Sequence, residues 1–341
     1  MAEEEGQAGE RARLEAARLL GSLPDVFDPL LSRLLDDPSN DVVRESIHSV
    51  GRLRKVDLAQ QLLKQFHSPL LHEAAAQALV AQGDSVIQLL SDRLGDPEVP
   101  AVERRAIPFV LKGIGTTASA EVLLENVMEG DTTLRFEIIT ALNKLHRDHP
   151  EIPLNTQKIE TVLAAEILGH YRTYQIMDAV SDPSSSDDVV GGALTNALRQ
   201  ELERIFRLLG LLYAHVDLYA VYIGLQSENK IVYDNALEFL ENVLKSELRV
   251  TLVPLLDGRI TTKERARLAN QFVRTKLENR AQAVDLLISS EDPWLKSCGA
   301  YAIGSFRMKS MARALAEYLD HTDPLLRETA RSAKLRLDED S

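Results

Sequence analysis

Two histidines and an aspartate lie next to one another in the segment His146-Arg147-Asp148-His149. Imidazole and carboxylate groups bind zinc, and a metal-binding helix usually presents two ligands four residues apart, with a third ligand held elsewhere. Here Pro150 follows directly and indicates that a helix ends in this segment. Histidine is favoured at a helix C-terminus by the helix dipole alone. We therefore interpret the segment as a helix end, and we predict no metal ion and no other cofactor.

The single cysteine, Cys298, is a potential nucleophile. A catalytic cysteine needs a nearby base and a group that stabilises an oxyanion, and no histidine lies close to Cys298 in the sequence. The glycines of residues 113–115 and 191–192 lack the strand, turn and helix that surround a phosphate-binding loop. We expect a protein that is not an enzyme, in which Cys298 is a small packing residue between helices.

The charge balance and the apolar stretches of the chain indicate which partners and which cellular compartment are plausible. The chain has 39 basic and 52 acidic residues, a net charge of −13. Because nucleic-acid binding needs a positive surface that displaces counterions from phosphates, we expect no nucleic-acid partner. One cysteine cannot form an internal disulfide, and residues 1–10 are acidic and polar, unlike a signal peptide. The apolar stretch Ile205–Leu225 is interrupted by Arg207 and Asp217, so we expect a cytoplasmic chain without membrane insertion.

A helical pattern of apolar residues four positions apart recurs at a spacing of about 30 residues. Its members are Val43/Ile47, Leu71/Ala75/Leu79, Val102/Ala106/Val110, Leu134/Ile138/Leu142, Val232/Ala236/Leu240, Leu268/Phe272, Leu295/Gly299/Ile303 and Leu326/Ala330. A leucine-rich segment precedes most of these helices, and several of the turns between carry an Asp-Pro pair that is typical of a helix N-terminus. One such hairpin cannot bury its apolar stripe, but a stack of hairpins can. The pattern predicts an all-α solenoid of about eight to nine helical hairpins.

The middle of the chain breaks this rhythm. Two helices much longer than the rest are predicted, from near Thr156 to Val180 and from near Val189 to Tyr213. The polar segment Ser181–Asp188 between them is predicted to be a mobile loop. We therefore divide the chain into N-terminal repeats at 1–150, a long-helix hairpin at 151–215 with the loop at 181–188, and C-terminal repeats at 216–341.

Two turn segments carry a family resemblance. Residues Asp37–Arg44 and Asp323–Ala330 resemble the turn and second helix of HEAT repeats, and the likeness extends over Pro24–His146 and Val216–Leu337. The small residues at the helix contacts fit the close helix approach of that family. The resemblance implies a HEAT-type α-solenoid that binds a protein partner.

A second resemblance concerns Ala197–Tyr213 and Asn235–Asn242, which are similar to the HEAT region of bacterial membrane proteins related to ADP/ATP translocases. In those proteins a transporter-like membrane domain precedes the solenoid, and a cyclic-nucleotide-binding domain can accompany it. The resemblance implies a cytoplasmic accessory or regulatory module that associates with a nucleotide-transporter-like membrane protein.

A row of cations follows the apolar column, at Arg44, Arg135, Arg265, Lys296 and Arg327. Acidic residues precede most of them, at Asp41, Asp131, Asp292 and Asp323. This arrangement favours an internal ladder of charge-assisted hydrogen bonds between neighbouring repeats over a basic stripe for an acidic partner.

Six of the eight tyrosines fall between residues 171 and 233. Tyrosine is enriched at contact surfaces, although long helices also need large side chains to fill the space between them. The candidates for partner contact are Tyr171, Tyr174, Tyr219 and Tyr222, with core packing as the alternative. The function expected from the whole sequence is a non-enzymatic interaction scaffold. The alternative is a helical-repeat enzyme of the bilin-lyase-like type, which needs a cavity lined by acids or histidine, or of the DNA-alkylation-repair-like type, which needs a basic, aromatic-lined cleft.

Overall fold

The structure, a computed structural model, describes residues 6–23, 27–180, 188–273 and 276–338. All regular secondary structure in these ranges is helical, which confirms the all-α prediction. Consecutive helices pack in pairs, as the repeat pattern predicted, at α2–α3, α4–α5, α6–α7, α10–α11, α12–α13, α16–α17 and α18–α19. The chain divides into two compact units, the first made of Met1–Glu129 with Thr133–Asn155 and the second of Gly130–Thr132 with Thr156–Ser341.

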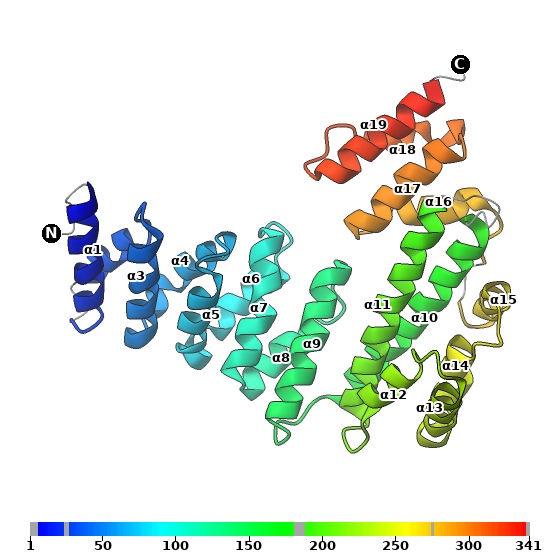
Figure 1. The fold of residues 1–341 in the computed structure, drawn as a ribbon, viewed down its shortest axis with the longest axis horizontal. Coiled ribbons are helices and arrows are strands. Elements are labelled where there is room, and N and C mark those ends of the chain that lie inside the picture. Colours follow the sequence, from blue (N-terminus) through cyan, green and yellow to red (C-terminus); the bar gives the residue numbers. More distant parts are fainter. Residues whose placement is uncertain (1–5, 24–26, 181–187, 274–275, 339–341) are drawn as a thin grey trace. The chain divides into compact units, whose positions relative to one another are not determined.

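The first unit is a regular stack of short helices (Figure 1). Its helices are α1 (Gly6–Leu20), α2 (Asp28–Leu34), α3 (Asn40–Leu53), α4 (Ala59–Lys64), α5 (His72–Val80), α6 (Ile87–Gly95), α7 (Ala101–Ile114), α8 (Thr117–Glu125) and α9 (Thr132–Asp148). The pairs α2–α3, α4–α5 and α6–α7 pack as hairpins, and α1, α3, α5 and α7 pack on one another in succession. Small residues allow this approach, since a Cβ added at Gly51 of α3 would lie 3.0 Å from Ala78 Cα of α5. The unit is therefore an α-solenoid.

The second unit is built around two long helices, α10 (Thr156–Val180) and α11 (Val189–Leu212). The remaining helices are α12 (Leu218–Gly224), α13 (Lys230–Val243), α14 (Ser246–Leu256), α15 (Thr262–Phe272), α16 (Arg280–Ile288), α17 (Pro293–Ser305), α18 (Ala312–Ala316) and α19 (Pro324–Asp338). Helix α10 packs mainly on α11 and α15 and also touches α14 and α16, while α11 touches α12 and α17. The long hairpin is thus the packing centre of this unit.

Both long helices have the bounds that the sequence predicted to within one residue. Residues 181–187 of the loop predicted to be mobile lie outside the described residues. Its last residue, Asp188, caps α11, because the carboxylate accepts a hydrogen bond of 2.9 Å from the Gly191 backbone nitrogen. The division of the chain at 150 and 215 stays a prediction.

A buried polar stripe joins α10 to α11. Arg204 Nε donates to the Glu166 carboxylate at 2.9 Å, and both side chains are at most 4% exposed. One turn further along, His170 Nδ1 lies 2.9 Å from Glu201 Oε2, and Thr173 Oγ1 donates to Glu201 Oε1 at 2.7 Å. Groups this deeply buried need partners with good geometry. The stripe therefore fixes how the two long helices are aligned.

Two of the four Asp-Pro turns, at Asp292 and Asp323, cap the following helix as predicted, whereas α3 and α7 begin after the Asp-Pro pairs at Asp37 and Asp96 without a side-chain cap. Asp292 Oδ1 accepts hydrogen bonds from the backbone nitrogens of Trp294 at 2.8 Å and Leu295 at 3.1 Å. Asp323 Oδ1 accepts one from the Leu326 nitrogen at 2.9 Å. A carboxylate in this position satisfies N–H groups that the helix leaves without a partner.

The predicted ladder of cations and acids is wrong for two of its members. Arg265 donates to the backbone carbonyl of Asp257 at 2.8 Å, and Arg327 donates to that of His321 at 2.9 Å. In both cases the arginine lies on the second helix of a hairpin and reaches a carbonyl in the connection that precedes it. Carbonyls near a helix end lack intrahelical partners, so a cation there completes their hydrogen bonding.

Candidate functional site

Tyr171, a predicted partner contact, lies inside the second unit and has no exposed surface. Its hydroxyl donates to the Thr251 carbonyl of α14 at 2.8 Å, and its ring packs on Phe272 of α15 with centroids 5.1 Å apart. Burial raises the pKa of Tyr171 to about 12. The side chain holds α14 and α15 against α10.

Stability should therefore fall as the pH rises from about 10 towards 12, because the unfolded chain loses the tyrosine proton first. The contribution from Tyr171 is complete below the unfolded pKa and disappears above the folded one. Chemical denaturation at a series of alkaline pH values measures this decline, and Tyr171→Phe should make it shallower. An identical decline in wild type and Tyr171→Phe would contradict this assignment.

Tyr174 and Tyr222 are also interior residues, with 8% and 7% of their surfaces exposed. The Tyr174 hydroxyl accepts a hydrogen bond of 3.3 Å from Arg265, whose guanidinium lies 5.1 Å from the ring centroid. Burial raises the pKa of both phenols. The Tyr222 ring packs on Phe206 of α11 at 5.3 Å. This burial removes Tyr171, Tyr174 and Tyr222 from the candidate contact surface, because their rings fill the space around the long hairpin.

Tyr219 differs from the other three, since 60% of its surface is exposed. It lies on α12 one turn before Ile223, which is also exposed, and the next helix, α13, exposes Ile231, Val232 and Phe239. We call these five side chains the α12–α13 seam. Single exposed apolar residues are common on proteins, but several on two adjacent helices indicate a contact surface.

The two helices that carry the seam are fixed by local signals. Asp217 caps α12 by accepting a hydrogen bond of 3.0 Å from the Ala220 nitrogen, and Asn229 caps α13 in the same way at the Ile231 nitrogen. A Cβ at Gly224 would lie 2.9 Å from Ala236 Cβ and 3.9 Å from Val232 Cγ1. Glycine therefore lets the end of α12 lie directly on α13, with Val232 beside the contact.

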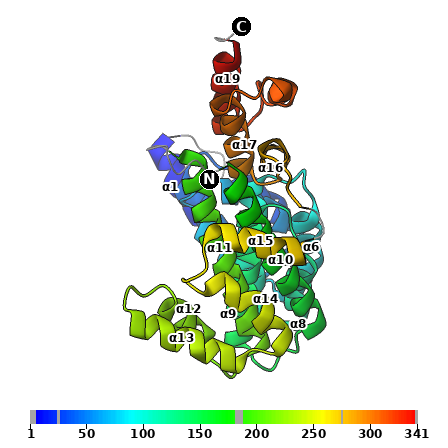
Figure 2. The same cartoon turned by 90° about the vertical axis from the view of Figure 1, so that its right-hand side faces the viewer.

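Helix α13 packs on α12 and α14, and Figure 2 shows it with α12 at the edge of the second unit. Its buried side chains are Leu237 and Leu240. Val232 belongs to the apolar column that the repeat pattern places in the core, yet 44% of its surface is exposed. The seam thus exposes a member of the apolar column, as α7 does at Val102, 51% of whose surface is exposed.

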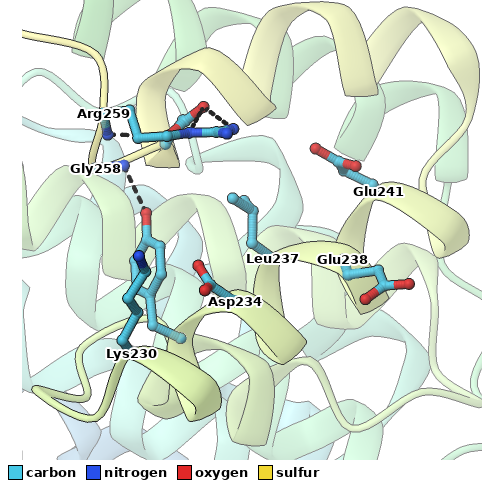
Figure 3. A pocket seen from close by; sticks show the side chains of 9 residues that line it. Lys230, Asp234, Leu237, Glu238, Glu241, Gly258 and Arg259 are labelled. Carbon is cyan, nitrogen blue, oxygen red and sulfur yellow. Dashed lines mark hydrogen bonds and ion pairs between the residues drawn. The ribbon is translucent and has the colours of Figure 1, made fainter.

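A pocket of about 480 Å³ lies on the other flank of α13, beside the loop between α14 and α15 (Figure 3). Tyr233 fixes this loop, because its hydroxyl accepts a hydrogen bond of 2.7 Å from the Gly258 nitrogen. Arg259 pairs with Asp257 through Nη2 and Oδ2 at 2.7 Å, and this hydrogen bonding holds the pKa of Asp257 below its usual value. The remaining acids of the pocket are Asp234, Glu238 and Glu241.

The residues considered for chemistry have structural roles. His149 lies over Gly115, the left-handed residue that ends α7, with Nε2 2.7 Å from where a Cβ would be. Its Nδ1 lies 3.2 Å from a Glu151 carboxylate oxygen. Within the described ranges no three histidine, cysteine or acidic side chains are placed to hold a metal ion together. Cys298 is buried in α17, and burial raises the pKa of its thiol to about 12, so the nucleophilic thiolate is disfavoured.

Sequence reasoning singled out Tyr219 but missed the other four residues of the seam and the acidic side of the pocket. The available signals were Tyr219 and Ile223 at i and i+4 and the acids Asp234, Glu238 and Glu241 at i, i+4 and i+7. Such spacing predicts that side chains share one helix face, but it does not predict whether a neighbouring helix covers that face.

Residues 27–107 match the family model of HEAT repeats, so this part of the chain contains HEAT repeats. No curated protein matches the sequence. Two solved structures overlap with it at low similarity. Human deoxyhypusine hydroxylase in complex with glycerol is 14% identical with a TM-score of 0.31, over 98% of this chain and 100% of the other. An engineered protein is 16% identical with a TM-score of 0.29, over 99% and 97%. Overlap at these scores is too low to indicate a shared activity.

Proposed function

We propose that this chain is a non-enzymatic scaffold that binds a protein partner through the α12–α13 seam. The observation that carries the proposal is the exposure of five large apolar side chains on two adjacent helices of the second unit. Covering such a surface removes apolar area from water and stabilises a complex. Stacked helical repeats present rigid surfaces of this kind, and HEAT repeats are present in residues 27–107.

The resemblance to the HEAT region of nucleotide-transporter-like membrane proteins supports a more specific version of this role. One of the two similar stretches, Asn235–Asn242, lies on α13 and includes Phe239. The partner would then belong to a membrane protein, and this chain would act on its cytoplasmic side as an accessory or regulatory module. No helix within the described residues is both long and apolar enough to cross a bilayer.

The acidic pocket keeps one enzymatic alternative open, because a bilin-lyase-like enzyme needs a cavity lined by acids or histidine. Asp257 is already paired with Arg259, which makes it a poor proton donor. If the pocket performs catalysis, Asp234→Asn together with Glu238→Gln must abolish activity on a bilin substrate. On the scaffold proposal, wild type shows no such activity.

The proposal can be tested by placing a photo-crosslinking amino acid at Phe239 in the full chain and irradiating living cells. The matched control position is Phe109 of α7, which is exposed to a similar degree, 56% against 45%. We expect a discrete crosslinked protein from position 239 and none of that identity from position 109. Equal crosslinking from both positions, or none from position 239, would overturn the proposal.

A further inference from the structure

The segment that carries the seam, residues 217–243, is strongly acidic. Its acids are Asp217, Glu228, Asp234, Glu238 and Glu241, against a single base, Lys230. Asp234, Glu238 and Glu241 form no salt bridge with any residue that the structure describes. Arg259 lines the same pocket and interacts electrostatically with Asp234 and Glu241, so it offsets part of the negative potential that the three acids set up beside the apolar side chains.

On α13, Val232 and Phe239 lie on a different flank from the acids, whereas Ile231, seven residues before Glu238, lies beside the acidic side chains. Val232 and Phe239 are seven residues apart and share one flank, which faces the seam with α12. Asp234, Glu238 and Glu241 lie on the opposite flank, which borders the pocket. A partner that lies along α13 therefore meets an apolar strip on one side and an acidic strip on the other.

We infer that the occupant of the seam is a basic amphipathic helix, whose apolar side chains lie on the α12–α13 seam and whose lysines or arginines reach the acidic strip. This inference rests on the proposed function and adds the chemistry of the partner. Helix α13 has 14 residues, so it matches an occupant of about four turns, or roughly 21 Å. The described residues contain no strand, so the partner has no sheet edge to extend and a helix laid into a groove is the applicable mode.

Charge also argues against two other occupants. A second copy of this chain, related by two-fold symmetry, would bring the same acidic strip to the interface, and like charges repel. An anionic membrane surface would be repelled for the same reason. A basic amphipathic segment buries apolar area on the apolar strip and is attracted electrostatically to the acidic strip.

Fluorescence anisotropy with the full chain and three labelled 14-residue peptides tests the inference. The first peptide is an amphipathic helix of leucine and lysine, the second replaces each lysine by glutamate, and the third is a shuffled order without an apolar face. We expect the leucine–lysine helix to bind at least about tenfold more tightly than either of the others.

Matched variants locate the binding. Asp234→Lys with Glu238→Lys should weaken the leucine–lysine helix by about tenfold or more, as should Phe239→Ser. The controls are Glu121→Lys with Glu125→Lys, which make the same charge change at the same spacing on exposed positions of α8, and Phe109→Ser. They should leave affinity within about twofold, because they lie outside the seam. Circular dichroism at 222 nm confirms that each variant is folded.

Three results would overturn the inference. They are an equal loss of peptide affinity in the α8 control variant, binding of the glutamate peptide as tight as that of the leucine–lysine helix, and a dimer in sedimentation that Phe239→Ser abolishes. The last result would assign the seam to a second copy of the chain. If the basic peptide fails but crosslinking from position 239 persists in cells, the partner chemistry is wrong and the proposed function stands.

Discussion

Replacing Glu166 by leucine is expected to lower the unfolding free energy by about 3–5 kcal/mol, because it leaves the Arg204 guanidinium buried without its carboxylate. Arg204 and Glu166 lie between α10 and α11, where water cannot replace the lost partner. Replacing both residues, as Glu166→Leu with Arg204→Met, should recover most of that loss, since the double variant buries no charge. Urea denaturation followed by circular dichroism measures each value.

A surface ion pair on the same helix provides the control. Glu160 of α10 pairs with Lys245 at 2.9 Å, but both side chains are about half exposed or more. Glu160→Leu should change the unfolding free energy by less than about 1 kcal/mol, because water screens the pair. A similar loss for Glu160→Leu and Glu166→Leu, or a double variant no more stable than Glu166→Leu, would show that the buried pair does not hold the long hairpin together.

The second large effect is expected at Gly299, where α17 lies against the end of α16. A Cβ at this position would lie 2.5 Å from the Ile288 backbone nitrogen and 2.8 Å from its Cα, closer than atoms pack. Because the obstructing atoms are backbone, a rotamer change cannot relieve the contact. Gly299→Ala should therefore lower the unfolding free energy by about 1–3 kcal/mol.

The same substitution at Gly169 should change the unfolding free energy in the opposite direction. Gly169 is exposed in the middle of α10, and no atom lies within 4 Å of its Cβ position. Alanine there reduces the entropy lost on folding, so Gly169→Ala should raise the unfolding free energy by roughly 0.5–1 kcal/mol. Thermal melts of the two variants beside wild type decide the point, and a Gly299→Ala protein as stable as wild type would contradict the close approach of α16 and α17.

Several helices were predictable from two local signals. Apolar residues four positions apart fix the helix interior, and an Asp-Pro pair such as Asp323-Pro324 fixes its start. The long helices were predictable for the same reason, since the polar residues after Val180 end one apolar stripe before the next begins. Helix α1 carries no such turn signal, so the pattern did not predict it.

The candidate site was not predictable to the same degree. Helical spacing shows that Tyr171 and Tyr174 share a face of α10, but only the packed structure shows that α14 and α15 cover that face. Conversely, Val232 and Val102 follow the core pattern, yet 44% and 51% of their surfaces are exposed. Which face of a helix is covered depends on contacts between residues far apart in the sequence, as in the 80-residue separation of Tyr171 and Thr251.

Hydrogen–deuterium exchange of the full chain, with and without the protein captured from position 239, tests directly whether a protein partner covers the α12–α13 seam. Residues 217–243 should exchange more slowly when the partner is bound, and this protection should be lost in the Phe239→Ser variant but not in Phe109→Ser. Protection confined to the first unit, with unchanged exchange in residues 217–243, would contradict the proposed coverage of the seam.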